Sequence, residues 1–124
     1  HEPSLRTIAM PADANPAGDI FGGWIMSQMD VAGAIYASHT VKGRLVTVAV
    51  ESMTFHLPVF VGDQVSCYCS IARVGRTSIS IHIETWVRRR NPEVELLRVT
   101  EATFTYVCID DNRKPRPIEV FAGN

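Results

Sequence analysis

Residues 15–38 read NPAGDIFGGWIMSQMDVAGAIYAS, and this stretch decides the fold. No proline interrupts the chain from Phe21 to about Ser38, and apolar residues recur there at helical intervals, at Phe21, Ile25, Met29, Ala32 and Tyr36. Apolar side chains lie nearly all round the helix that this spacing predicts. We therefore expect a long helix buried at the centre of the protein, preceded by a polar loop over 11–18.

The residues on either side of this helix are typical of β-strands. A short strand is expected from Leu5 to Met10. After Gly43 the apolar period shortens to two, which predicts longer strands at 45–55, 65–74, 77–87 and 97–109. The pair Gly75-Arg76 predicts a hairpin turn, because glycine accepts the positive φ that tight turns demand. Residues 110–117 are expected to form a polar tail.

These elements predict an α+β fold in which an antiparallel sheet of about five strands wraps around one long central helix. A length of 124 residues fits a single domain over 1–124. One helix cannot cover both faces of so long a sheet, and the sheet keeps edge strands whose backbone groups need partners. We therefore expect a homodimer.

Composition narrows the classes of function. The formal net charge is −1, which does not indicate a nucleic-acid binder, and no apolar run approaches the roughly 20 residues of a membrane span. Cys67 and Cys69 alternate in a predicted strand, so we expect free buried thiols and a cytoplasmic protein without disulfides. The four histidines make no ligand spacing with this pair, so neither a metal nor a cofactor is expected.

Asp30 is the feature of the helix that packing alone does not explain. It is the only charge between Trp24 and Ser38, and it belongs to a stripe of small or polar residues, Gly23, Ser27, Asp30 and Ala34. A carboxylate on a buried helix is costly unless it is paired, and such groups cluster at functional sites. The alternative is that the stripe faces solvent and the carboxylate is hydrated.

The residues before the helix offer a second element. Free N–H groups at a helix N-terminus attract negative charge, and Gly22-Gly23 would let a substrate carbonyl approach them closely, as an oxyanion site requires. The alternative for this glycine pair is close packing of the helix on the sheet. Asp19 is expected to be an ordinary N-cap.

Several motifs in order resemble a known family. The runs Asn15-x-x-Gly18-x-x-Phe21-Gly22-Gly23, Met29-Asp30-x-Ala32-Gly33, Val46-Thr47-Val48 and Gly75-Arg76-Thr77-Ser78 are similar to the acyl-CoA thioesterase branch of the hotdog superfamily. The resemblance extends from about Leu5 to Pro117 and is strongest to the small bacterial broad-specificity enzymes. It implies hydrolysis of an acyl-CoA to a carboxylic acid and coenzyme A, so coenzyme A is part of the substrate.

The resemblance also implies roles for individual residues. Asp30 matches the catalytic aspartate, which acts either as general base on water or as nucleophile. Asn15 matches an asparagine that comes from the opposite subunit, and Thr47 matches a threonine that supports the water. The N–H of Gly23, with that of Gly22, would hold the thioester oxygen. The assembly implied is a homodimer, joined further into a trimer of dimers.

The phosphates of coenzyme A would favour basic residues near the cleft. Candidates are Arg76, the run Arg88-Arg89-Arg90, and Arg113, Lys114 and Arg116, although each could equally be a solvated surface charge. In the family, the segment Gly75, Arg76, Thr77 and Ser78 lies along the pantetheine arm.

Two alternatives remain beside hydrolysis. A hotdog dehydratase would need a histidine and a carboxylate, and His56-Leu57-Pro58 is weakly similar to its histidine-proline signature. That interpretation leaves Asn15 and Asp30 without a role. A non-enzymatic acyl-CoA sensor of the same fold would lack the catalytic groups that this chain keeps.

Overall fold

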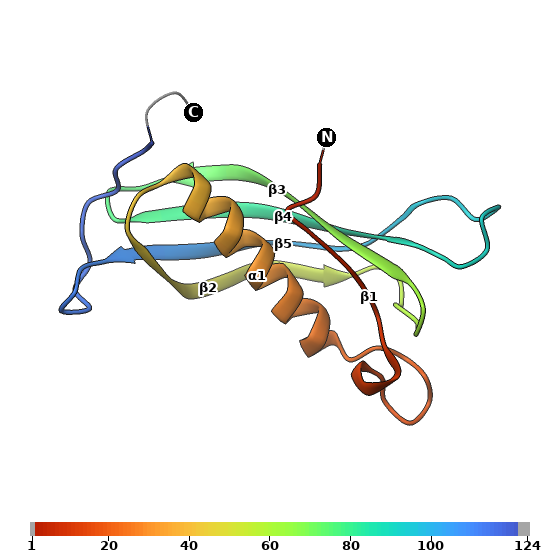
Figure 1. Cartoon of the computed structure of the whole chain (residues 1–124). Helices are drawn as coiled ribbons and strands as arrows, with labels where there is room; N and C mark the ends of the chain where they lie inside the picture. Colours follow the sequence, from red (N-terminus) through yellow and green to blue (C-terminus); the bar gives the residue numbers. More distant parts are fainter. Residues whose placement is uncertain (1, 122–124) are drawn as a thin grey trace.

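The computed structural model describes residues 2–121 and shows one helix lying across one face of a five-stranded antiparallel sheet (Figure 1). The strands are β1 (Leu5–Ile8), β2 (Arg44–Phe55), β3 (Gln64–Val74), β4 (Ser78–Arg88) and β5 (Leu97–Ile109), and the helix is α1 (Gly22–Thr40), with a 3-10 turn η1 (Pro11–Asp13) before it. The α+β class and every predicted strand are confirmed, with boundaries shifted by one or two residues.

The order of strands in the sheet is β1-β3-β4-β5-β2. β2 is therefore an edge strand that pairs only with β5, although the six residues from Pro58 to Asp63 lead towards β3. The chain crosses from one edge of the sheet to the far side between these two strands. Sequence order alone does not give this crossover, since each strand has the same alternating pattern.

The core lies between α1 and the inner face of the sheet. Along β4 the isoleucines Ile79, Ile81 and Ile83 are fully buried, while the residues between them are partly exposed or polar, as their alternation predicts. Cys67, Cys69 and Cys108 are buried free thiols, which confirms the expectation of no disulfide.

The predicted helix is present, but the single chain buries one face of it and leaves another open. α1 buries Ile25, Met29, Ala32, Gly33 and Ala37 against the sheet. The opposite face leaves Met26, Val31 and Ile35 exposed by 38–49% of their surface. Among residues 2–121 the sheet is the only layer that covers the helix, so an apolar helix face stays open.

The hairpin at Gly75 is present, but its predicted reason is wrong. The connection spans three residues, and Gly75 donates a 2.7 Å hydrogen bond to the carbonyl of Ser78 without adopting a positive φ. A Cβ at Gly75 would lie 2.8 Å from Oγ of Ser78. A larger residue at this position would require the Ser78 hydroxyl to turn away, and no left-handed conformation is involved.

Candidate functional site

Asp30 is half-buried on α1 and faces the edge strand β2. The hydroxyl of Thr47 donates a 2.7 Å hydrogen bond to Oδ1 of Asp30, which joins two residues that sequence analysis singled out separately. In the single chain the residues of the stripe that contains Asp30 are exposed or half-buried, but the carboxylate is not simply hydrated. One oxygen is held by a hydroxyl, which leaves Oδ2 available for a reacting group.

A third residue contacts this position from the next strand. Tyr106 on β5 is fully buried, and its hydroxyl donates a 2.8 Å hydrogen bond to the backbone carbonyl of Asp30. Burial raises the pKa of Tyr106, and the nearby Asp30 carboxylate raises it further. Nothing in the sequence marks Tyr106 for a role, because it shares its buried strand face with Phe104 and has no motif around it.

The start of α1 carries backbone donors without acceptors. The N-cap is Phe21, and among residues 2–121 no acceptor contacts the N–H groups of Gly22 and Gly23. A Cβ at Gly23 would meet nothing within 4 Å, so the alternative that this glycine permits close helix packing is wrong. The expectation that Asp19 is the N-cap is also wrong, because the helix begins three residues later and the backbone of Asp19 bridges to Phe60.

Asn15 organises the loop that leads into this helix. Its Oδ1 accepts hydrogen bonds of 3.0 and 3.1 Å from the backbone N–H groups of Ala17 and Asp19. The N–H of Phe21 donates to the carbonyl of Asp13 at 3.1 Å, so the loop and the helix start form one unit, residues 13–23. In the described chain the amide nitrogen Nδ2 of Asn15 has no partner, which leaves it free to donate outside this loop.

The two groups of candidates do not meet within one chain. Asp30 lies seven positions after Gly23, which corresponds to roughly 10 Å along a helix axis at about 1.5 Å per residue. Within residues 2–121 no hydrogen bond links Asn15 to Asp30. One chain therefore presents two separate halves, the Asp30–Thr47 pair and the 13–23 unit.

An open, largely apolar cavity adjoins the second half. It has a volume of about 360 Å³ and is lined by Ile20, Gly22, Ile25 and the stretch 55–59. A Cβ at Gly22 would lie 3.3 Å from the ring of Phe55, so the glycine leaves this ring room at the mouth of the cavity. The arrangement places backbone donors beside an apolar space.

The predicted substrate-binding residues are not all brought together. Ser78 pairs with Val107, which pairs with Val46 beside Thr47, so the segment Gly75, Arg76, Thr77 and Ser78 lies two strands from the Asp30–Thr47 pair. Arg88 is at the other end of β4, roughly 33 Å away at about 3.3 Å per residue. In one chain Arg88 cannot serve the same ligand group as Arg76.

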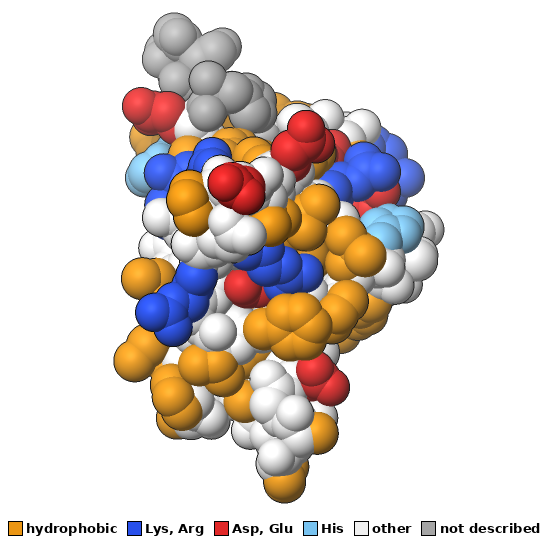
Figure 2. Space-filling view, turned by 90° about the vertical axis from the view of Figure 1, so that its right-hand side faces the viewer, with side chains coloured by type: hydrophobic (Ala, Val, Ile, Leu, Met, Phe, Trp, Pro, Cys, Tyr) orange, Lys and Arg blue, Asp and Glu red, His pale blue; other side chains and the backbone are white. Residues whose placement is uncertain are grey.

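Arg89 is committed to a structural contact. It forms an ion pair with Asp63, whose surface is 3% exposed, donates to the carbonyl of Pro58 at 3.1 Å, and lies 4.7 Å from the centroid of the Phe60 ring. Figure 2 views this end of the molecule and shows basic side chains interspersed with exposed apolar ones. Of the run 88–90, Arg89 is therefore not available to a phosphate.

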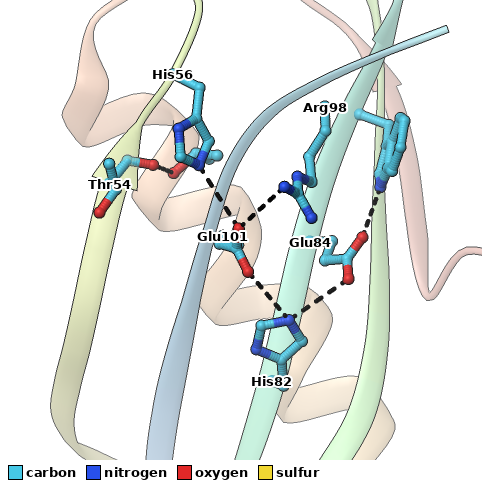
Figure 3. A network of polar contacts seen from close by, with 8 residues as sticks. Thr54, His56, His82, Glu84, Arg98 and Glu101 are labelled. Atoms are coloured by element: carbon cyan, nitrogen blue, oxygen red, sulfur yellow. Dashed lines mark hydrogen bonds and ion pairs between the residues drawn. The ribbon is translucent and has the colours of Figure 1, made fainter.

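His56 and His82 lie apart from Asp30. His56 is 3.5 Å from Glu101, and His82 is 3.5 Å from Glu84 and 3.6 Å from Glu101. Figure 3 shows this network in front of the sheet with α1 behind it, so the sheet separates it from the helix. His56 thus does not join the Asp30–Thr47 pair within one chain, although it lines the cavity beside Gly22.

No helix within 2–121 is long and apolar enough to cross a membrane. In the same range, no group of three or more histidine, cysteine, aspartate or glutamate side chains could hold a metal ion.

This chain is similar in sequence to known thioesterases. The family model described as the thioesterase superfamily matches residues 17–92. The acyl-CoA thioester hydrolase YciA of Salmonella typhimurium is 56% identical over 118 residues, 94% of this chain and 89% of the relative.

Solved structures show the same similarity. The hexameric thioesterase y2039 from Yersinia pestis superimposes with a TM-score of 0.90 at 54% identity, over 95% of this chain and 96% of that one. A hexameric hotdog fold thioesterase of Campylobacter jejuni gives a TM-score of 0.89 at 45% identity, over 96% and 91% of the two chains.

Proposed function

The chain belongs to the thioesterase superfamily and has the hotdog fold, and from this premise we propose that it hydrolyses acyl-CoA thioesters to a carboxylic acid and coenzyme A. The observation that carries the proposal is the hydrogen bond from Thr47 to Asp30, which holds one oxygen of an isolated helix carboxylate and leaves the other free. The same proposal takes residues 1–124 as one catalytic domain.

The chemistry needs few groups. A thioester carbonyl is already activated, and its thiolate leaves readily, so an oriented oxygen nucleophile and donors for the developing oxyanion suffice. Oδ2 of Asp30 either removes a proton from water as the water attacks, or attacks the carbonyl itself to form an anhydride that water then opens. A single turnover in ¹⁸O-labelled water identifies the second route when label enters Asp30, because water that opens the anhydride at the Asp30 carboxyl carbon leaves its oxygen there, whereas the general-base route never does.

Each active site combines two protomers in this proposal. The N–H groups of Gly22 and Gly23 and the amide of Asn15 would stabilise the thioester oxygen. In their own chain, however, the two glycines lie two helical turns from Asp30, and Asn15 lies in the loop before the helix. A second copy can supply them. The exposed Met26, Val31 and Ile35 on α1, and Val48 and Val50 on the edge strand β2, support an apolar surface shared between copies.

Coenzyme A would extend from this site. The end of the sheet that carries Thr47 also carries the segment Gly75, Arg76, Thr77 and Ser78. This segment would follow the pantetheine arm, and its Arg76 side chain is exposed. Arg88 could reach the same ligand only from another protomer. The edge strands β2 of two copies would join into one sheet, and the hexameric relatives support a trimer of such dimers.

The test is release of free thiol from short, medium and long acyl-CoAs by the purified protein and by its Asp30→Asn variant. Asp30→Asn should lose turnover while it still binds a non-hydrolysable acyl-CoA analogue, because the amide is nearly the same size but is neither base nor nucleophile. Near-normal hydrolysis by a folded Asp30→Asn variant would remove Asp30 from the mechanism. Absence of hydrolysis by the wild-type protein on every chain length would remove the proposed activity.

A further inference from the structure

Two neighbouring strands each donate a hydrogen bond to Asp30. Thr47 on β2 and Tyr106 on β5 are direct cross-strand partners, so their side chains project from the same face of the sheet towards α1. Thr47 donates to the Asp30 carboxylate, and Tyr106 donates to the Asp30 backbone carbonyl. One register position of the sheet therefore holds both the side chain and the main chain of the same residue.

Gly33 shows that the helix is shaped for the tyrosine. A Cβ at Gly33 would lie 2.3 Å from the hydroxyl oxygen of Tyr106 and 2.8 Å from Cδ1 of Ile83. No real side chain tolerates such a distance, so only glycine lets the hydroxyl reach the turn of α1 that carries Asp30. Gly33 has an ordinary helical conformation, so glycine is required here because it has no side chain and not because of its backbone.

The contact restricts how the helix can move. The carbonyl of Asp30 points along the helix axis, and a donor fixed in the sheet core limits both sliding and rotation of α1 at that turn. Tyr106 itself is fixed, because it has no exposed surface and pairs with Ile79 on its other side. Burial raises the pKa of Tyr106, so the hydroxyl keeps its proton and stays a donor across the pH range of an assay.

The pairing of β2 with β5 is also irregular beside Thr47. The register of β2 against β5 shifts between Thr47 and Ala49, leaving Val48 as an extra residue that is 56% exposed. Bulges of this kind re-aim the side chains beside them and are frequent next to active sites. Here the bulge immediately follows the residue whose hydroxyl meets the carboxylate.

We propose that Tyr106 is a positioning residue for hydrolysis, which sets the height and rotation of α1 so that Asp30 meets Thr47 and presents its second oxygen to the reacting group. The inference rests on the proposed thioesterase activity and adds a residue to it. Tyr106 touches no substrate in this scheme, since it is buried beneath the helix and acts through Asp30.

The first experiment compares Tyr106→Phe with Tyr68→Phe by steady-state kinetics. Both remove one tyrosine hydroxyl from the same sheet, but Tyr68 lies on the outer face, where its hydroxyl accepts a 3.4 Å hydrogen bond from Arg6. Tyr106→Phe should lower kcat by roughly 10- to 100-fold with little change in KM, since a displacement of about 1 Å at a catalytic group can cost that much. Tyr68→Phe should keep the wild-type kcat.

The second experiment is a double-mutant cycle with Thr47→Val. If both hydroxyls position Asp30, the combined variant should lose less than the product of the two single losses. A crystal structure of Tyr106→Phe should show the Asp30 to Thr47 distance lengthened from 2.7 Å or the Asp30 side chain rotated. If Tyr106→Phe fails to fold, Gly33→Ala serves instead, because its Cβ displaces the hydroxyl while the tyrosine remains.

The outcomes separate the two proposals. Wild-type kcat in a folded Tyr106→Phe or Gly33→Ala protein overturns the positioning role alone, and so do fully multiplicative losses in the cycle. If the wild-type protein shows no hydrolysis, the proposed function falls. The crystal structure then decides the positioning role, and an unchanged Asp30 geometry in Tyr106→Phe overturns it.

Discussion

Gly23 and Asp30 lie on the same helix and belong to the same stripe of small or polar residues, yet they are two turns apart, roughly 10 Å at about 1.5 Å per residue. A reacting carbonyl cannot touch the backbone donors of the first and the carboxylate of the second within one chain. If two protomers face each other through this helix, the Gly23 end of one stripe can lie beside Asp30 of the other protomer.

Mixing two inactive variants should therefore restore activity. Asp30→Ala and Asn15→Ala chains, each without turnover, would form heterodimers in which one site carries both changes and the other carries neither. Random reassortment makes half of the dimers mixed, each with one working site of two, which gives about a quarter of the wild-type rate for a two-fold symmetric dimer. No recovery after verified subunit exchange would place both residues in the same chain.

Removal of the Thr47 hydroxyl should slow the reaction. Thr47→Val keeps the shape of the side chain but leaves Oδ1 of Asp30 without its 2.7 Å donor. A hydrogen bond to a charged group is worth about 1.5–3 kcal/mol, so kcat should fall by roughly 10- to 100-fold. Thr47→Ser keeps the hydroxyl and should retain most of the rate, and a Thr47→Val enzyme as active as Thr47→Ser would contradict the role.

Loss of Arg89 should reduce stability more than loss of an exposed arginine. Arg89→Ala leaves the Asp63 carboxylate, 3% exposed, without its cation, and removing one partner of a buried ion pair costs about 3–5 kcal/mol. The matched control is Arg98→Ala. Arg98 is 43% exposed and its 3.5 Å contact with Glu101 is worth less than about 1 kcal/mol. Urea denaturation measures both, and equal losses would show that the buried pair adds nothing.

Stability should fall as pH rises above 9. Burial raises the pKa of Cys67 from 9.0 to about 11, so on unfolding the thiol becomes easier to ionise. A raised pKa in the folded state gives a stabilising contribution that is complete below pH 9 and lost as pH rises towards 11. Denaturation between pH 8 and 11 should show this loss, and Cys67→Ala should make it shallower. An identical pH dependence in Cys67→Ala would assign the loss to other groups.

The sequence determined the elements and most of their boundaries. β-Branched residues alternate with polar ones in each long strand, and the apolar spacing from Phe21 onwards suits a helix and no strand, so local pattern was enough. Asp30 could be singled out for the same local reason, as the one charge on that helix. The glycine pair could be singled out from its place at the start of the helix, and the match to a family motif added Asn15 and Thr47.

What the tertiary structure decided concerns residues far apart in the sequence. β2 takes the edge beside β5, and this order sets Thr47 opposite Tyr106. The order follows from packing among strands with equivalent patterns, and no local signal distinguishes the possible orders. The contact of Gly33 with the Tyr106 hydroxyl spans 73 positions and depends on where the helix settles on the sheet. The open apolar face of α1 is likewise a property of the assembled layers, because the helix is apolar nearly all round and only the sheet decides which side it covers.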